Sequence, residues 1–486
     1  MNKLIITFLV SYLFTLDLSA QTIEDALRYS QLNSGGTARS IATGGALSAF
    51  GGDFGTLSIN PAGIAAYRKS TLMITPSLNL SRTGSTFAKA EFDDNRTNIN
   101  LNNIGVVFSK TSNASDWKSV NFGIGTNRLT NNNQEFFYEG TTVGTIAERW
   151  LAFANGNVPD NLYEFEEGIA YDAGILFPLG NTDDQYLIDP DGTQLLKKEQ
   201  TVIRSGSVND LNLTLGGNYR HKLYVGVTVG LPFVRYEETK NYTETDELGV
   251  SSEFNSMTFD EFFSTTGVGF NAKLGVVYRM NQNVRFGAAI HTPTFFNLTD
   301  QYYTSIQSDI TIAGTQYITP AESSISNFSY NLISPWRAIG SVGFLFGKHG
   351  FISGDIEYVD YAASQFNFET DPSFEQDLNT EITNNFDAVV NLRVGGEARY
   401  GVFAVRGGLG YSMSPYQDNS GFSGGQTNMS FGVGMREKSL FLDLGIARGL
   451  YNETYTPYTV PGATENPSVA NSVSKTQFVG TIGFRF

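Results

Sequence analysis

Histidines are the side chains best suited to acid–base chemistry near neutral pH, and the chain has only 3 of them in 486 residues. His221 and His349 fall in short predicted turns, and His291 alone is predicted to face inward, next to Pro293. One histidine among scattered serines does not supply the nucleophile, base and orienting group that a hydrolase needs. The chain has no cysteine, which excludes thiolate chemistry and disulfides, and no paired histidines suggest haem binding. The sequence therefore predicts no enzyme, no cofactor and no metal site.

Charged side chains recur at inward-facing positions of the predicted strands, and they have two interpretations. Arginine suits bidentate pairing with a carboxylate, so Arg337 and Arg393 are candidates for contact with an acidic ligand. Alternatively, charges of both signs on neighbouring strands brace a wall through ion pairs, which is the interpretation we favour. A charge on a lipid-facing position would cost about 2–4 kcal/mol at the midplane, so these side chains should point inward. The other members of the set are Lys273, Asp355, Glu357, Glu397, Arg399, Arg406 and Asp443.

The elements that carry these charges alternate with a period of two. In segment 223–231 the odd-numbered residues are all Leu or Val, and the even-numbered residues are Tyr, Gly and Thr. Segments 268–278, 390–399 and 477–486 alternate in the same manner. Such alternation is typical of a half-buried strand, and it fits a barrel wall with lipid outside and a polar lumen inside.

Fourteen candidate strands follow one another, an even number, as single-chain bacterial barrels require. We expect them at 69–81, 98–111, 118–138, 207–220, 222–245, 260–280, 283–305, 329–347, 350–367, 387–400, 402–415, 426–437, 439–457 and 473–486. Short turns alternate with long loops, as in outer-membrane barrels. The long loops are expected at 82–97, 139–206, 246–259, 306–328, 368–386, 416–425 and 458–472.

The longest loop, 139–206, is predicted to contain helices at 145–153 and 162–176. Trp150 and Phe153 lie on the first helix. Either these two side chains bind hydrophobic ligands outside the membrane, or the helix packs on the rim of its own barrel.

The composition fits an exported membrane protein. Charged residues make up only 16% and aromatic residues 13%, and the net charge of −16 argues against a surface for nucleic acid. Residues 1–20 read as a signal peptide, with Lys3, an apolar run from residue 4 to 16 and Ala20 before a cleavage site. We therefore divide the chain into signal peptide 1–20, an N-terminal hatch 21–67 and a barrel 68–486.

The hatch begins with a predicted helix at 22–32 and continues as a glycine-rich stretch, 35–67. Asn60 can cap a second short helix that starts at Pro61. A flexible linker is the alternative interpretation, but the apolar residues of the stretch argue against it. They are Ile41, Leu47, Phe50, Phe54, Leu57 and Ile59.

The segment 38–46, the run Gly51-Gly52-Asp53 and the motif Asn60-Pro61-Ala62-Gly63 resemble the hatch of FadL-type transporters of long-chain fatty acids and other hydrophobic compounds. The resemblance implies an all-β fold: a 14-stranded antiparallel transmembrane β-barrel with a small N-terminal helical hatch inside its lumen. It further implies passive diffusion of hydrophobic molecules across a bacterial outer membrane. The terminal Phe486 resembles the signal read by the barrel-assembly machinery.

The resemblance also implies roles for individual residues. Asp53, Asn60, Pro61, Ala62 and Gly63 are gate candidates, and Phe50 and Phe54 join the ligand-contact candidates. In that family a kinked third strand makes a lateral opening into the lipid. Here the third predicted strand has two glycines but no proline, so the sequence does not place a kink. The same hatch resembles FadL-like accessory barrels of type IX secretion, which handle protein cargo, and this alternative stays open.

Overall fold

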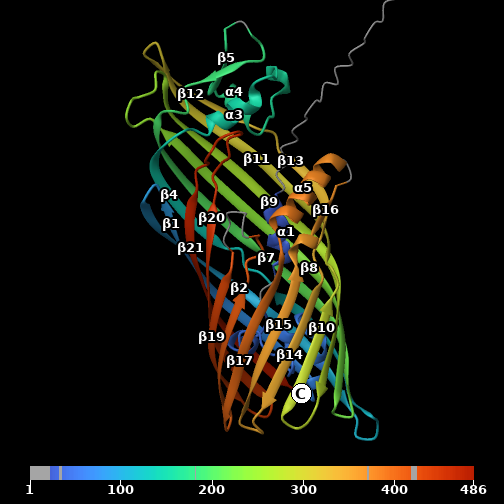
Figure 1. Cartoon of the computed structure of the whole chain (residues 1–486). Helices are drawn as coiled ribbons and strands as arrows, with labels where there is room; N and C mark the ends of the chain where they lie inside the picture. The colour runs from blue at the N-terminus through green and yellow to red at the C-terminus, as the bar shows by residue number, and fades with distance from the viewer. Residues whose placement is uncertain (1–21, 32–34, 181, 369–370, 418–423) are drawn as a thin grey trace, which may run out of the picture.

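The computed structural model describes residues 22–31, 35–180, 182–368, 371–417 and 424–486, so the predicted signal peptide lies outside the described residues. One antiparallel sheet closes on itself, because β1 (Thr71–Phe87) pairs with both β2 (Ala90–Thr111) and β21 (Val469–Arg485). The result is a tall tube (Figure 1). Over these residues no helix is long and apolar enough to cross a membrane. The predicted all-β, 14-stranded antiparallel barrel is confirmed.

Ten of the wall strands in the described chain are continuous, and the other four are interrupted. Besides β1, β2 and β21, the continuous strands are β7 (Leu195–Tyr219), β8 (Leu223–Thr245), β9 (Phe254–Arg279), β17 (Ala388–Tyr400), β18 (Phe403–Ser412), β19 (Gln426–Arg436) and β20 (Leu440–Tyr455). The interrupted strands are β3 (Trp117–Arg128) with β4 (Gln134–Val143), β10 (Val284–His291) with β11 (Phe295–Ile312), β12 (Thr315–Glu322) with β13 (Ser326–Ile333) and β14 (Arg337–Leu345), and β15 (Gly350–Asp360) with β16 (Gln365–Asn367).

The wall is apolar outside and polar inside, as its sequence alternation predicts. On β9, Val268, Phe270 and Leu274 are exposed, whereas Asn271 and Lys273 are buried. This is the inverse of a soluble protein, and it suits a tube whose outer face meets lipid.

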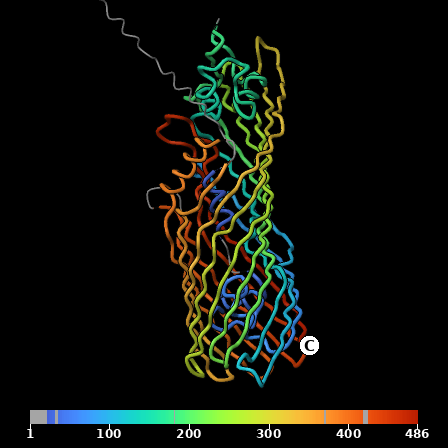
Figure 2. Tube along the Cα trace, turned by 90° about the vertical axis from the view of Figure 1, so that its right-hand side faces the viewer, coloured from blue at the N-terminus to red at the C-terminus, as the bar shows by residue number. Residues whose placement is uncertain are grey.

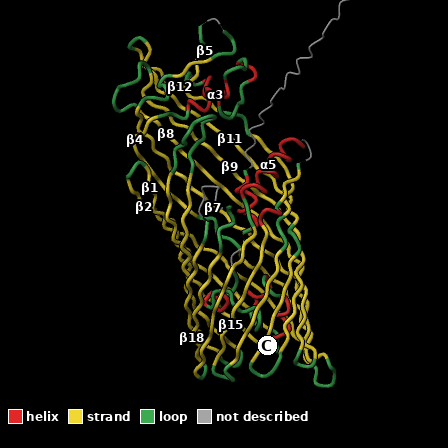
Figure 3. The backbone as a smooth tube through the Cα atoms, viewed as in Figure 1, coloured by secondary structure: helices red, strands yellow, loops and turns green. Residues whose placement is uncertain are grey.

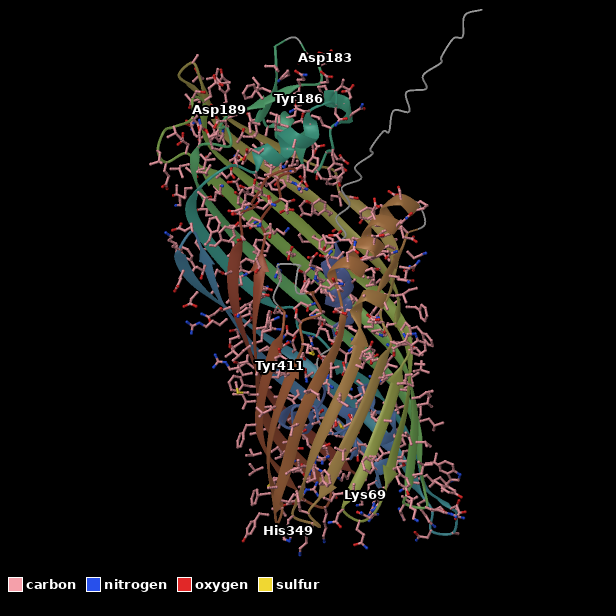
Figure 4. The ribbon with its side chains drawn as sticks, in the orientation of Figure 1. Lys69, Asp183, Tyr186, Asp189, His349 and Tyr411 are labelled. Carbon is pink, nitrogen blue, oxygen red and sulfur yellow. The ribbon has the colours of Figure 1, made fainter. Side chains whose placement is uncertain are left out.

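The two ends of the tube differ. Lys69 and His349 lie at the end with short turns, and Asp183, Tyr186 and Asp189 lie at the other end (Figure 4). The second end carries a loop module with α3 (Ala147–Ala154), η3 (Pro159–Asn161), α4 (Glu167–Asp172), β5 (Leu176–Pro178) and β6 (Tyr186–Ile188), and separately η4 (Tyr361–Ala363) and α5 (Pro372–Asn385). The long–short rhythm of the connections agrees with an outer-membrane barrel.

Two of the predicted loops are wrong, because the strands continue beyond the part of the wall that faces lipid. β1 and β2 extend to a tight hairpin at Ala88–Lys89, where both residues have positive φ, so 82–97 is not a loop. The segment 306–328 similarly forms the β11–β12 hairpin. Outside the bilayer the outward face no longer needs apolar side chains, so the alternation on which the prediction relied fades while pairing continues. The expected helix at 162–176 shortens to α4.

The N-terminal segment folds inside the tube. Helix α1 (Ile23–Ser30) forms where predicted, and the Asp25 carboxylate accepts a hydrogen bond from the Thr22 amide at 3.0 Å. The glycine-rich stretch, which we call the plug (residues 35–67), forms α2 (Ala38–Ala42) and two 3-10 turns, η1 (Phe54–Ser58) and η2 (Pro61–Ala66). Figures 1 to 3 show the plug in the half of the lumen nearest the short turns.

Candidate functional site

The plug is bonded to the wall on several sides. None of residues 36–67 is exposed. The Ala38 amide donates to Thr481 Oγ1 on β21 at 2.8 Å, and Asn121 Nδ2 on β3 donates to the Ile64 carbonyl at 2.6 Å. His291 Nε2 on β10 lies 2.8 Å from the Ile59 carbonyl. The inward histidine noted in the sequence therefore binds plug backbone.

Asn60, a predicted gate residue, joins two parts of the plug and the wall. Its Oδ1 accepts from the Ala62 amide at 3.1 Å, which caps η2 as expected. Its Nδ2 donates to the Ser48 carbonyl at 3.1 Å and to the Val276 carbonyl on β9 at 3.4 Å. The neighbouring Gly275 has no side chain, and a Cβ there would collide with Asn60 Oδ1. Wall glycines therefore make room for the plug.

The other gate candidates are also buried within the plug. Asp53 caps η1 by accepting from the Gly55 amide at 2.9 Å, and its carboxylate accepts from Thr37 Oγ1 at 2.6 Å. Pro61 begins η2, and Ala62 packs against Tyr224 and Val277 of the wall. Gly63 lies against Gly51, and its carbonyl accepts from the Gly52 amide at 2.9 Å. Their role as a moving gate stays a prediction.

Inward charges pair with one another, as the favoured interpretation predicts. Arg39 of the plug lies 2.9 Å from Glu397 on β17. Glu397 also pairs with Arg406 at 2.7 Å, and Arg406 pairs with Asp443 at 2.6 Å. All four side chains are buried, so the network ties the plug to three wall strands.

The ligand-contact candidates from the sequence lie in separate places. Phe50 packs on Phe351 with ring centroids 4.4 Å apart, and Phe54 is buried in one cluster with Leu57 and Ile64. Arg337 lies 2.8 Å from Glu357. Of the six candidates, all of them in the described chain, only Arg393 lines the lumen cavity, and it too pairs with Glu357 at 2.8 Å. Contact of these residues with ligand remains a prediction.

The remaining two candidates lie in the loop module. Trp150 is fully buried and packs edge-on against Phe259 of β9, with centroids 5.3 Å apart. Phe153 is half-buried, with the Arg149 guanidinium 4.9 Å from its ring. Burial within the module raises the pKa of the Glu167 carboxyl, which accepts from the Tyr163 amide at 3.0 Å. The first helix thus packs on its own barrel, the second of the two interpretations.

A lumen cavity of about 880 Å³ lies between α1, the plug and the inner face of the wall. Much of its lining is amide and hydroxyl side chains. Those nearest β1 to β4 are Asn79, Ser81, Asn98, Asn102, Thr130, Asn131, Asn132, Asn133 and Gln134. The asparagine run 131–133 is the sequence signal that would have pointed here, because it interrupts the alternation of the third predicted strand.

The wall is broken where this cavity meets the third strand. β3 pairs with β2 only as far as Asn127 opposite Asn103. Beyond that point β4 pairs with β7 and not with β2, and β2 pairs only with β1. Two polar links and one ring contact bridge the unpaired edges. The Phe137 amide donates to Asp94 at 2.7 Å, Arg96 lies 3.3 Å from Glu135, and the ring centroids of Phe92 and Phe137 lie 5.2 Å apart. The third predicted strand, in which the sequence placed no kink, is therefore interrupted between β3 and β4.

Apolar groups surround the break. On its lipid-facing side Ile99 is 81% exposed and Leu101 is 44% exposed. On the inward face of the wall, further along the same strands, a buried aromatic cluster has Phe87 4.8 Å from Tyr138 and Phe136 5.1 Å from Tyr455, measured between ring centroids. The outer face of the break is therefore apolar.

Solved structures share this architecture. A Pseudomonas aeruginosa FadL homologue aligns over 94% of this chain and 100% of its own, with 12% identity and a TM-score of 0.57. The toluene transporters TodX of P. putida and TbuX of Ralstonia pickettii each align over 93% of this chain and 99% of their own, at 13% and 16% identity and TM-scores of 0.51. No protein-family model and no curated protein matches the sequence. The likeness establishes the fold.

Proposed function

We propose that this chain, which has the fold of the FadL-type outer-membrane channels, is a passive channel for small hydrophobic compounds in a bacterial outer membrane. The observation that carries the proposal is the position of the cavity. It reaches the wall at the unpaired edges of β2 and β4, while the plug occupies the lumen toward the short turns. A molecule that enters from the loop end would leave sideways between these edges.

Two further features support this route. Ile99 and Leu101 line the lipid-facing side of the break, so an apolar compound would meet apolar surface as it leaves. TodX and TbuX, which share the fold, are named as toluene transporters. We therefore take monoaromatic hydrocarbons and long-chain fatty acids as the substrate classes to test, with no cofactor.

Closing the break tests the proposal. Continuing the register from Asn103 and Asn127 would set Ile99 opposite Asn131. The chain has no cysteine, so the double variant Ile99→Cys/Asn131→Cys can be joined with a short bifunctional thiol reagent. The matched control is Ile104→Cys/Thr126→Cys, where β2 and β3 already pair.

Uptake of toluene and of a long-chain fatty acid is measured in cells that lack other such channels. We expect cross-linking to stop uptake in the first variant and to leave it unchanged in the control. Equal uptake before and after cross-linking of Ile99→Cys/Asn131→Cys would contradict lateral exit. Recovery of the wild-type chain with a large secretion pore, together with no uptake, would instead favour the accessory barrel.

A further inference from the structure

Positive charge is concentrated at the short-turn end of the barrel, where Lys69 and His349 lie in Figure 4. The whole chain has 48 acidic residues against 32 lysines and arginines. The turns at this end, with the strand ends beside them, reverse that balance: they contain 13 lysines and arginines and two acidic residues, Asp116 and Glu437. The segments counted are 67–70, 110–118, 220–222, 279–285, 345–350, 399–403, 436–440 and 485–486.

Three arginines of this end form a cluster that we call the arginine patch: Arg68, Arg279 and Arg285. Arg279 on β9 and Arg285 on β10 are directly opposite each other in the antiparallel ladder, so both side chains leave the same face of the wall. That face is the inner one, because the Arg285 guanidinium lies 5.4 Å from the ring centroid of Phe50 in the plug. Arg68 directly follows the plug, whose last turn, η2, packs against β7, β8 and β9.

A neighbouring histidine experiences the charge of the patch. His221 lies in the turn between β7 and β8. Burial lowers the pKa of its imidazole below the ordinary value, and the positive charges of Arg68, Lys118 and Arg279 lower it further. Arg68 and Arg279 therefore lie near the same turn.

The patch has no carboxylate of its own. None of its three arginines forms an ion pair with a residue that the structure describes. The Nε of Arg285 is buried without a hydrogen-bond partner in this part of the chain, and Arg279 Nε donates to the backbone carbonyl of Asn281 at 3.2 Å. Asp116, in the turn before β3, is engaged by Arg220 at 2.8 Å.

This arrangement is unfavourable unless an anion binds. Like charges directly opposite each other destabilise a sheet, and a guanidinium with a buried, unbonded N–H loses hydration without compensation. An anion that reaches Arg279 and Arg285 together would remove the repulsion between them. It would also supply an acceptor for the free N–H.

The position and spacing of the patch indicate what kind of anion fits. Its side chains leave the inner face of the wall at the periplasmic end, whereas lipid surrounds the outer face. Paired residues of an antiparallel sheet have Cβ atoms about 4.5–5.5 Å apart, and residues one turn apart on a helix have Cβ atoms about 5–6 Å apart. Carboxylates one turn apart on one polypeptide therefore match neighbouring arginines of the patch.

We propose that the arginine patch is a docking surface for an acidic segment of a periplasmic protein, whose carboxylates pair with Arg68, Arg279 and Arg285. Arg285 lies over Phe50 and Arg68 continues the chain of the plug, so the bound segment would lie against the plug on its periplasmic side. The inference goes beyond the proposed function, because it depends on the orientation of the barrel and not on the compound that passes through it.

The experiment measures binding of a defined acidic peptide to the purified full chain in a non-ionic detergent. The probe is a labelled helical peptide with glutamates one turn apart, and its matched probe has glutamine at the same positions. Fluorescence anisotropy gives both affinities. The variants are Arg68→Gln, Arg279→Gln, Arg285→Gln and the triple variant. Two controls each remove one exposed cation elsewhere: Lys438→Gln, in the turn between β19 and β20, and Arg448→Gln, on the outer face of β20.

We expect wild type and both controls to bind the glutamate peptide more tightly than the glutamine peptide. Each single variant should lower the affinity for the glutamate peptide about three- to tenfold, because a charge-assisted hydrogen bond is lost. The triple variant should bind the two peptides equally. Equal affinities for the two peptides in wild type, or a loss in Lys438→Gln as large as in Arg279→Gln, would overturn the proposal.

A second measurement distinguishes a protein partner from a lipid head group. Native mass spectrometry of the protein from phosphatidylglycerol and from phosphatidylcholine nanodiscs counts the lipids that stay bound. We expect the same retention of phosphatidylglycerol in wild type and in the triple variant. If the triple variant loses this lipid and binds the glutamate peptide as wild type does, the patch binds lipid and the proposed class of partner is wrong.

Stability distinguishes a docking surface from a structural brace. Arg279→Gln removes one of two like charges that face each other, so its midpoint on cold–hot gel electrophoresis should be at or above that of wild type. A midpoint below that of wild type would show that Arg279 stabilises the unbound barrel, which would overturn the argument from repulsion. Toluene uptake should not change in this variant, so failure of the docking surface leaves the proposed channel untouched.

Discussion

The guanidinium of Arg39, in the plug, lies 2.9 Å from the carboxylate of Glu397 on β17, and both side chains are buried. Glu397 also pairs with Arg399 and Arg406 on the wall. One carboxylate therefore joins the plug to the barrel and braces neighbouring wall strands at the same time.

Replacing Arg39 with alanine should loosen the plug and leave the barrel folded, because Glu397 keeps two wall arginines. We expect a higher single-channel conductance for small ions in planar bilayers. Arg399→Ala is the matched control, since it removes a partner of Glu397 that does not belong to the plug. Equal conductance in the two variants would show that the ion pair between Arg39 and Glu397 does not hold the plug in place.

Glu397→Ala should destabilise the protein more than Arg39→Ala does. It leaves Arg39 without its carboxylate partner and Arg406 with Asp443 alone, and breaking a buried ion pair costs about 3–5 kcal/mol. The temperature at which the barrel loses its compact form on cold–hot gel electrophoresis should fall below that of Arg39→Ala. A midpoint no lower than that of Arg39→Ala would contradict the shared role of Glu397.

Gly408 on β18 should not tolerate a larger side chain. Its Cβ would collide with the backbone of Thr43 and Gly44, so Gly408→Val should displace the plug and raise conductance. Gly407→Val is the matched control, because Gly407 is exposed and its nearest neighbour would lie 3.9 Å from the new Cβ. Wild-type conductance in Gly408→Val would mean that the plug adjusts around the valine.

Deleting residues 35–67 should raise leakage of small polar solutes through the barrel, because the plug occupies the lumen toward the short turns. Swelling of liposomes that contain the purified protein in arabinose measures the leak. Swelling no faster than with the intact chain would show that the plug is not the barrier. The deletion tests whether the plug blocks the lumen, whereas Gly408→Val tests whether the plug must pack closely against the wall.

Trp150→Ala should unfold the loop module and spare the barrel. The side chain is fully buried against Phe259, and truncating a buried tryptophan costs about 3–5 kcal/mol. We expect protease cleavage between residues 144 and 194 in intact cells. Phe153→Ala, at a half-buried position, is the control and should remain resistant. Cleavage of neither variant would show that Trp150 does not hold the module together.

The fold could be predicted because its cause is periodic. A wall strand in lipid must alternate apolar and polar residues, so segments such as 223–231 and 477–486 can be recognised as strands from the sequence alone. The prediction failed for 82–97 and 306–328, where strands leave the bilayer and the outward face is free to be polar. Strand pairing in these two segments depends on the neighbouring strand, and the residue pattern of a single segment does not predict it.

The candidate site could be predicted only in part. The sequence predicted that Asn60 caps a short helix and that Pro61 lies in its first turn, and the structure confirms both. The wall glycines that receive the plug, such as Gly275, are distant in sequence from the residues they face. Lys475 and Asn131 are 344 positions apart and meet only because the barrel closes.

The sequence by itself determined the barrel and the direction of its charges, because both follow from the cost of placing polar groups in lipid. It also revealed a nearly uncharged, glycine-rich segment ahead of the barrel. Only the tertiary structure decided where the ladder of the wall stops and which inward charges pair with one another. Asn103 and Asn127 end the β2–β3 ladder, and residues 128–134, which follow Asn127, line the cavity. A ladder that stops is a relation between two strands, and the way the barrel closes creates it.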